Sequence, residues 1–397
     1  MRILLTMNLP YEPPLGGANR ANRIIAEMLV AAGHSVSAVV PVGATASNSS
    51  SLRPFEHLKL GALNVTENKA TYSFRLAGVQ VHAVPGPLGA LRTTLTSELS
   101  AFAPDCILIS SEDPMQVLFR AALTYHSASM IYIAHTLSCL PFGPYSFESG
   151  RSRSSLLNNA SSIIAVSQFS ADYIRRWSDL SPTQLYLPVY GRPPYPRFGQ
   201  FGKGYVTMIN PCKYKGIDIF VAMARAFPNT YFAGVPSWGT TSQDLAEMRS
   251  IPNVTLLAAT PDIDAILSMT TILLVPSLWV ENLGMIVIEA MLRGIPVIAS
   301  DVGGIAEAKL GTRYLIPIRP ITEFAKTWDD NKLWIPIVPA QDISGWSDAL
   351  RHLLTNRDLY ERESAEARKV AVQFVGSLSF GPMLRAIEDA VSGHGSK

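Results

Sequence analysis

Residues 275–308 read VPSLWVENLGMIVIEAMLRGIPVIASDVGGIAEA, and this stretch decides the fold. Its pattern predicts a buried strand, a loop that holds Glu281, and a helix from about Met285 to Arg293. Gly294 is the residue type that ends a helix, and a second apolar strand follows it. Strand, loop, helix and strand in this order indicate a parallel α/β sheet.

The same alternation extends over the rest of the chain in two runs. Residues 187–204, LPVYGRPPYPRFGQFGKG, separate the runs, because their four prolines and four glycines fit no helix or strand. A helix is expected from about Ala18 to Ala32. Strands are expected at Arg2–Met7, Ser35–Val40, Val79–Val84, Cys106–Ile109, Met130–Ala134 and Ser162–Val166, and then at Tyr205–Ile209, Thr230–Ala233, Val254–Leu257, Ile272–Val275, Pro296–Ala299 and Tyr314–Ile316.

The two runs predict two doubly wound domains, at residues 1–190 and 203–376. The 397 residues suit two domains of roughly 150 to 200 residues each. Residues 357–391 read as two helices that separate near residues 376–380. In the second of these helices, apolar residues recur at helical spacing and need a partner surface; they are Met383, Leu384, Ile387 and Val391.

Composition excludes several classes of function. Charged residues make up 16% of the chain and the net charge is +2, which gives no basic face for nucleic acid. The apolar stretches at 271–280 and 285–292 are too short to span a membrane, and the N-terminus does not read as a secretory leader. Cys106, Cys139 and Cys212 lie far apart, so neither a disulfide framework nor a zinc site is expected, and a reducing cytoplasm fits.

The helix that begins near Met285 predicts a phosphate site. Its N-terminus offers unpaired backbone N–H groups and a partial positive charge, and Gly284 lets a ligand approach the backbone. Glu281 and Glu289, eight residues apart, place a carboxylate on each side. Carboxylates accept hydrogen bonds from hydroxyl pairs, here a ribose and a transferred sugar. The alternative is an ordinary helix with one solvated and one capping Glu, which the surrounding PSxxxExxG and GxPVIASDVGGIxE patterns disfavour.

Residues 276–308 resemble the signature of glycosyltransferase family 4. The resemblance implies an α/β fold of GT-B architecture, with two facing Rossmann-like domains and a last helix, within residues 377–397, that returns to the first domain. Glu281 and Glu289 match the E-x7-E pair of the family. The resemblance implies that Glu281 faces the donor sugar and that Glu289 holds the ribose hydroxyls.

Residues 209–220, INPCKYKGIDIF, match a second segment of the family, in which a basic residue before Gly binds the donor pyrophosphate. Lys215 fits this position, and its ammonium would stabilise the charge that grows on the leaving group. The family usually has an Arg five residues earlier, where this chain has Asn210; Lys213 is a candidate for the missing charge. The alternative for Lys215 is a surface lysine in a turn.

In the first domain, Gly16 and Gly17 resemble the family's first-loop glycine pair, and Arg20 follows at the start of a helix. His135 comes at the carboxyl end of a strand, where ligands bind in open α/β sheets and where the family often has a His near the donor sugar. A tight turn, a solvated first-turn residue and a packed loop histidine are the alternatives. The predicted catalytic set is Glu281, His135 and Lys215; the predicted donor-binding set is Gly16, Gly17, Arg20, Asn210, Lys213, Lys215, Glu281, Asn282, Leu283, Gly284, Met285 and Glu289.

Several further features have two readings. The Gly303–Gly304 pair is either a second phosphate-proximal turn or a structural turn, and loop residues Trp238 and Trp279 either stack on a sugar or pack. Asp262 and Asp264 read as the capped start of a helix rather than as metal ligands. Residues 43–51, which are serine-rich, and the loop after His135 are candidates for acceptor binding by position alone.

The sequence therefore predicts a cytoplasmic hexosyltransferase that uses a nucleoside-diphosphate sugar, most directly a UDP-sugar, and the family resemblance implies that it retains the anomeric configuration. The acceptor is expected to be a soluble small molecule, in secondary-metabolite or small-glycan biosynthesis. No cofactor is expected, and the resemblance implies that no metal is needed; Lys215 and helix amides would then meet the pyrophosphate charge. A GT-B nucleotide-sugar epimerase and a non-catalytic nucleotide-sugar-binding protein remain as alternatives.

Overall fold

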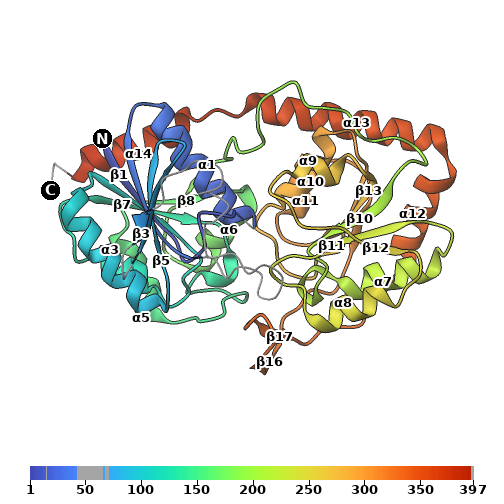
Figure 1. Cartoon of the computed structure of the whole chain (residues 1–397), viewed down its shortest axis with the longest axis horizontal. Helices are drawn as coiled ribbons and strands as arrows, with labels where there is room; N and C mark the ends of the chain where they lie inside the picture. Colours follow the sequence, from blue (N-terminus) through green and yellow to red (C-terminus); the bar gives the residue numbers. More distant parts are fainter. Residues whose placement is uncertain (15, 43–65, 68–70, 395–397) are drawn as a thin grey trace. The chain divides into compact units, whose positions relative to one another are not determined.

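The computed structural model describes residues 1–14, 16–42, 66–67 and 71–394. The described chain forms two compact units, each built on its own sheet (Figure 1). Unit 1 contains Met1–Val189 and the C-terminal segment from Ser379, and unit 2 contains Tyr190–Leu378. The serine-rich candidate segment at 43–51 lies outside the described residues.

The sheet of unit 1 contains nine strands among the described residues. They are β1 (Arg2–Thr6), β2 (Ser35–Pro41), β3 (Thr66–Glu67), β4 (Tyr72–Leu76), β5 (Val79–Val84), β6 (Cys106–Ser110), β7 (Ser129–Ala134), β8 (Ser162–Ala165) and β9 (Thr183–Gln184). Their order is β3-β4-β5-β2-β1-β6-β7-β8-β9; the β3–β4 and β4–β5 pairs are antiparallel, and the other described pairs are parallel. β6 and β7 are buried along their whole length, as expected of parallel strands covered on both faces.

The helices of unit 1 include the C-terminal helix of the described chain. They are α1 (Gly17–Ala31), α3 (Leu88–Phe102), α4 (Val117–Ala122), α5 (Arg151–Leu156), α6 (Gln168–Trp177) and α14 (Gly381–His394), with 3₁₀ turns η1 (Leu137–Cys139) and η2 (Leu157–Asn159). α14 packs on β6 and β7 and buries Met383 and Ile387. The Ser129 hydroxyl donates to the Ala390 carbonyl at 2.8 Å. The predicted return of the last helix to the first domain is confirmed.

The main sheet of unit 2 is entirely parallel. Its strands are β10 (Tyr205–Ile209), β11 (Phe232–Val235), β12 (Val254–Leu256), β13 (Thr270–Val275), β14 (Val297–Asp301) and β15 (Leu315–Pro317), in the order β12-β11-β10-β13-β14-β15. The chain moves outward from β10 to one edge and then from β13 to the other, so the strand order reverses between β10 and β13. Ligands of such sheets bind at this reversal, beyond the carboxyl ends of the strands.

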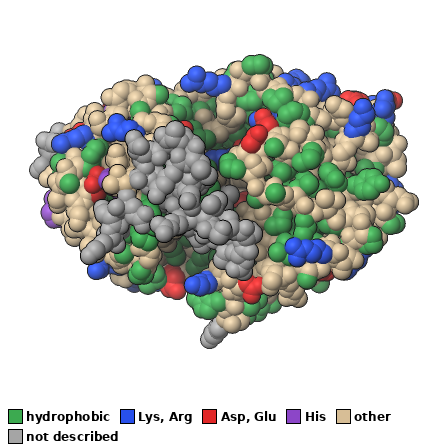
Figure 2. Space-filling view, viewed as in Figure 1, with side chains coloured by type: hydrophobic (Ala, Val, Ile, Leu, Met, Phe, Trp, Pro, Cys, Tyr) green, Lys and Arg blue, Asp and Glu red, His purple; other side chains and the backbone are tan. Residues whose placement is uncertain are grey.

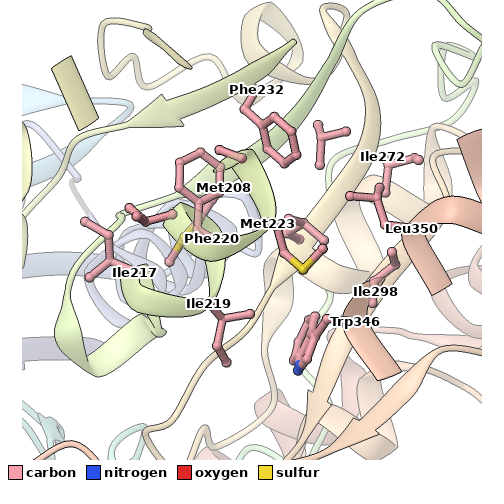
Figure 3. Packing of buried hydrophobic residues seen from close by; sticks show 14 of the residues in the cluster. Met208, Ile217, Ile219, Phe220, Met223, Phe232, Ile272, Ile298, Trp346 and Leu350 are labelled. Atoms are coloured by element: carbon pink, nitrogen blue, oxygen red, sulfur yellow. The ribbon is translucent and has the colours of Figure 1, made fainter. Parts of the chain in front are cut away.

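The helices of unit 2 cover a core of aliphatic and aromatic side chains (Figure 3). Phe220 and Phe232 meet edge to face with ring centroids 5.7 Å apart, and the Trp346 side chain is fully buried. The helices are α7 (Ile217–Ala226), α8 (Ser242–Arg249), α9 (Ile263–Leu267), α10 (Met285–Leu292), α11 (Ile305–Ala308), α12 (Ser344–Thr355) and α13 (Arg357–Ser377), with the 3₁₀ turn η3 (Lys213–Lys215). A separate antiparallel pair, β16 (Phe324–Trp328) and β17 (Trp334–Pro336), completes the described unit.

The predicted strands are confirmed, with small shifts at their ends. β11 begins two residues later than expected, and β4, β9, β16 and β17 have no counterpart in the sequence analysis. Residues 187–204 contain no helix or strand, as predicted. This segment is nevertheless tied to unit 2, since the Phe198 and Gly199 amides both donate to the Arg293 carbonyl and the Arg368 guanidinium donates to the Tyr195 carbonyl at 2.6 Å.

One helical stretch of the described chain, Arg357–Gly393, is long and apolar enough by length and composition to be a candidate membrane span. The sequence analysis considered 271–280 and 285–292 and did not single out this stretch. Residues 378–380 interrupt it between α13 and α14.

On the surface in view, Lys and Arg side chains are scattered in small groups among uncharged ones (Figure 2).

Candidate active site

In unit 2, Lys215 and Glu281 meet at the reversal of strand order. Lys215 belongs to the loop after β10 and Glu281 to the loop after β13. The Lys215 ammonium donates to Glu281 Oε1 in a close ion pair, and the buried Ser277 hydroxyl donates to the same oxygen at 2.9 Å. The two charged side chains are 22% and 17% exposed. Because they are only partly shielded from water, a ligand can still reach both charges.

Three glycines allow the loops around this ion pair to touch through their backbones. A Cβ on Gly216 would lie 2.0 Å from the Pro276 carbonyl oxygen, and its φ of +78° also favours glycine. A Cβ on Gly303 would lie 2.3 Å from the Glu281 carbonyl oxygen, and the Gly304 amide donates to that oxygen at 2.8 Å. The Gly303–Gly304 turn therefore supports the loop that carries Glu281.

The loop after β13 leads into the N-terminus of α10. Gly284 precedes the helix with a φ of +83°, and no side chain caps the first turn. Asn282 and Leu283 are buried, whereas Gly284 and Met285 are partly exposed. The uncapped N–H groups of this turn can receive an anion. Glu289 lies further along α10 with only 4% of its surface exposed, so it is not the solvated helix residue of the alternative reading.

Asn210 and Lys213, the two residues considered near the pyrophosphate, have different surroundings. Asn210 is 4% exposed with a φ of +55°, and its Oδ1 accepts the Gly239 amide at 3.0 Å. Its Nδ2 has no partner among the described residues. Lys213 forms a 2.5 Å ion pair with Asp218 in which both side chains are well exposed. The buried amide of Asn210 is therefore the better-placed donor at the position where the family has Arg.

In unit 1, His135 is held by a side chain from α1. His135 Nε2 lies 2.9 Å from Asn22 Oδ1, and Asn22 Nδ2 donates to the Ser110 hydroxyl at 2.7 Å. The nitrogen of the Asn22 amide donates to Ser110, so the amide oxygen faces His135 and accepts from Nε2. In a neutral imidazole the other nitrogen, Nδ1, is then the hydrogen-bond acceptor. Burial lowers the pKa of His135, so the ring is neutral at neutral pH.

A hydroxyl network joins the loops after β6 and β7 beside His135. The Ser111 hydroxyl accepts the backbone amides of His135 and Thr136, each at 3.0 Å. The Glu112 carboxylate accepts from the hydroxyls of Ser110, Ser111 and Thr136. The sequence analysis missed Asn22, Ser110 and Glu112. The available signal was the run Ser-Ser-Glu-Asp directly after a predicted strand.

The first-loop glycines start α1 at the same edge of the unit 1 sheet, beyond β1. Gly16 precedes the helix with a φ of +141°, and Gly17 is its first residue. The Asn19 amide donates to the Pro10 carbonyl at 3.1 Å, which fixes the loop onto the helix. Arg20 lies partly buried in the first turn. Unit 1 thus holds the glycine pair, Arg20 and His135, and unit 2 holds the other predicted site residues.

The aspartates and cysteines take structural positions. Asp262 Oδ1 accepts the Asp264 amide at 3.0 Å at the start of α9, which confirms the predicted cap, and Asp264 pairs with Arg293. Within the described residues, no group of three or more His, Cys, Asp or Glu is placed to hold a metal ion. The three cysteines are buried free thiols, and burial raises the pKa of Cys106 to about 12.

Two doubly wound units with a C-terminal helix that returns to the first unit define the GT-B architecture. Residues 15–187 match the sequence model of Glycosyltransferase Family 4, and residues 203–356 match that of Glycosyl transferases group 1. The chain is therefore a glycosyltransferase of GT-B architecture, and each of its two domains matches a glycosyltransferase model.

Solved structures share this fold at low sequence identity. Sucrose-phosphate synthase from Thermosynechococcus elongatus is 17% identical, with a TM-score of 0.67 over 98% of this chain and 99% of that one. Anabaena HepE in complex with UDP-glucose is 16% identical, with a TM-score of 0.64 over all of both chains. S. aureus TarM in complex with fondaparinux, α-GlcNAc-glycerol and UDP is 10% identical, with a TM-score of 0.63 over 98% and 99%. No curated protein matches the chain.

Proposed function

We propose that the chain transfers a hexosyl group from a UDP-sugar to a hydroxyl group of a soluble small molecule, with retention of anomeric configuration and without a metal ion. The observation that carries this proposal is the contact between Lys215 and Glu281 at the strand reversal, beside the uncapped N-terminus of α10. The UDP-glucose named in the HepE structure supports the choice of donor.

On the donor side, the diphosphate takes the first-turn amides of α10 and the Lys215 ammonium. Lys215 then moves from the Glu281 carboxylate to a phosphate oxygen and stabilises the charge that develops as the glycosidic bond breaks. Ser277 keeps its hydrogen bond to Glu281 during this exchange, so the freed carboxylate stays oriented toward the sugar. Glu289 accepts hydrogen bonds from the ribose hydroxyls, and the Asn210 amide donates to the diphosphate.

On the side of unit 1, the neutral His135 ring offers Nδ1 as an acceptor. A ring nitrogen that accepts a hydrogen bond suits a sugar hydroxyl, because a neutral hydroxyl can donate one hydrogen bond to it. Arg20 and the N-terminus of α1 supply further positive potential at the same edge of the sheet. These groups give the edge of the unit 1 sheet hydrogen-bonding partners for sugar hydroxyls. The three free buried thiols suit a reducing compartment, so we place the reaction in the cytoplasm.

The direct test is incubation of the purified chain with labelled UDP-glucose, UDP-galactose and UDP-N-acetylglucosamine, with and without a library of hydroxylated small molecules. The expected result is a labelled glycoside whose anomeric configuration, read by proton NMR, equals that of the donor, at a rate that EDTA leaves unchanged. An inverted product contradicts retention, and loss of the rate in EDTA contradicts metal independence.

The same incubation separates the alternatives. An epimerase converts the donor sugar without an acceptor, and a binding protein returns the donor intact while calorimetry still detects UDP. The Lys215→Ala variant is the matched control for the transferase, because it removes the proposed leaving-group contact while the neighbouring Lys213 stays in place. Either alternative result overturns the assignment as a transferase.

A further inference from the structure

The antiparallel pair β16–β17 carries an exposed aromatic surface. Trp328 and Trp334 pair across the two strands with ring centroids 4.3 Å apart and planes 31° apart. Trp328 is 56% exposed, and Ile335 of the same strand pair and Ile337 at its end are 37% and 53% exposed. We call residues 324–337 the tryptophan hairpin. It projects away from the six-stranded sheet at the lower edge of the view (Figure 1).

The base of the hairpin is fixed to the two loops that hold the Lys215–Glu281 pair. The Tyr214 hydroxyl, next to Lys215 in the chain, donates to the Trp334 carbonyl. The Tyr214 ring lies between Phe324, at 6.1 Å, and Trp279, at 5.0 Å. Just before the hairpin, the Ile321 amide donates to the Leu278 carbonyl at 2.9 Å.

The tip of the hairpin is fixed to a third loop, the one after β11. The Asn331 amide donates to the Thr240 carbonyl at 3.1 Å, and the backbone amide and hydroxyl of Ser242 both donate to Asp330. These three loops leave the carboxyl ends of β10, β11 and β13. The hairpin is therefore braced at the ligand-binding edge of the unit 2 sheet, and its Trp328 ring is held on a rigid support.

The chemistry of this surface suits a neutral sugar ring. One face of a pyranose consists of C–H groups, which lie flat against an indole, while the hydroxyls at its rim stay in water or hydrogen-bond. Residues 324–337 contain two acidic and two basic residues, so the hairpin lacks the basic excess that an anionic lipid surface attracts. A neutral carbohydrate therefore fits the charge of the hairpin better than a membrane surface.

We propose that the tryptophan hairpin is a carbohydrate-binding platform on which a pyranose ring of the acceptor stacks against Trp328. The platform rests on the proposed transferase function and narrows the acceptor to a glycan, or to a molecule that already carries a sugar. Trp334 supports Trp328 from behind, and Tyr214 couples the platform to the loop of Lys215.

The test is binding of the full chain to an array of α- and β-linked di- and trisaccharides of common pyranoses. We expect retention of at least one glycan by the wild type, a loss of at least tenfold in affinity for Trp328→Ala, and recovery of most of that loss in Trp328→Phe. The matched control is Trp177→Ala, which removes another exposed tryptophan, 44% exposed and in unit 1, and should bind glycans as the wild type does.

Two results overturn the platform: no glycan is retained, or Trp328→Ala binds as well as the wild type. Preferential sedimentation of the wild type, but not of Trp328→Ala, with phosphatidylcholine–phosphatidylglycerol vesicles also overturns it, in favour of a lipid surface. UDP affinity, measured on the same samples by calorimetry, separates the two proposals. Normal UDP binding without glycan binding refutes the platform alone, whereas glycan binding without UDP binding refutes the donor site alone.

Discussion

Both units place loops at the carboxyl ends of parallel strands, yet they place different chemistry there. At the reversal between β10 and β13, unit 2 holds the ion pair of Lys215 and Glu281, which water still reaches. Around β6 and β7, unit 1 holds a neutral histidine beside hydroxyl and amide groups, and the hydroxyls donate to the Glu112 carboxylate. The comparison teaches that one topology can present either a charged edge, suited to phosphate, or a hydrogen-bonding edge, suited to sugar hydroxyls.

The strongest way to break this comparison is to remove the cation of the charged edge. We expect Lys215→Ala to lower kcat about 100- to 1000-fold, the usual loss when a group that stabilises leaving-group charge is deleted. The measurement is steady-state transfer from a UDP-sugar, with circular dichroism to verify folding. The control is Lys213→Ala, which removes an exposed lysine paired with Asp218 and should keep near-normal activity. Equal losses in both variants would contradict a special role for Lys215.

The contact between the loops of unit 2 is tested by Gly216→Ala. The change costs about 1–3 kcal/mol of stability for its left-handed backbone and about 1–3 kcal/mol more for the clash with the Pro276 carbonyl. Gly33→Ala in unit 1 is the matched control, because its φ is +87° but nothing lies within 4 Å of the added Cβ. Urea denaturation should therefore show a larger loss for Gly216→Ala. If the two variants lose the same free energy of unfolding, the backbone contact between Gly216 and Pro276 contributes little to stability.

A smaller expected effect concerns Glu289. We expect Glu289→Gln to weaken UDP binding by about 1.5–3 kcal/mol, because the charged acceptor of two hydroxyls becomes a neutral amide with one acceptor oxygen while the side-chain volume is kept. Calorimetry with UDP measures the loss. The 2′-deoxy analogue of UDP tests the ribose contact directly. The wild type should bind this analogue more weakly than UDP, whereas Glu289→Gln should bind the two with similar affinity. If Glu289→Gln still prefers UDP over the 2′-deoxy analogue by the same factor as the wild type, Glu289 does not bind the ribose.

The smallest effect tests whether the His135 ring of unit 1 is uncharged. Burial holds the pKa of His135 below its ordinary value of 6.5, so between these two values the unfolded chain binds more protons than the folded chain. Stability should therefore fall as the pH drops below about 6.5, and this contribution should be absent in His135→Gln. Urea denaturation at pH 7.5 and 5.5 measures the difference. His352→Gln, which removes an exposed histidine, should keep the wild-type dependence; the same slope in His135→Gln would contradict a neutral ring.

The sequence predicted the fold well where local pattern determines structure. The parallel strands are short apolar runs between glycines and prolines, so their existence and order could be read directly. β4 was missed because it forms a hairpin with β5 through Ala77 and Gly78, both with positive φ, and alanine gives no sign of that conformation. β16 and β17 are short and irregularly paired, and contacts with Tyr214, Thr240 and Ser242 hold them in place.

For the candidate site, the sequence predicted residues that lie close to their motif and missed those that meet only in the fold. Lys215 and Glu281 each stand in a recognisable loop, and their contact follows from the adjacency of β10 and β13. Asn22 and His135 are 113 residues apart, and Asn22 and Ser110 are 88 apart. Their meeting depends on β1, β6 and β7 being neighbours, which residue spacing does not reveal.

The position of α14 in the chain has a consequence for how the protein is made. Its buried residues Met383 and Ile387, and the carbonyl that Ser129 binds, are synthesised only after all of unit 2, residues 190–378. At about 5–20 residues per second, the ribosome needs roughly 10–40 seconds to pass through unit 2. During that time the surface over β6 and β7 that α14 covers is bare. Unit 2 can therefore finish folding before unit 1, although unit 1 leaves the ribosome first.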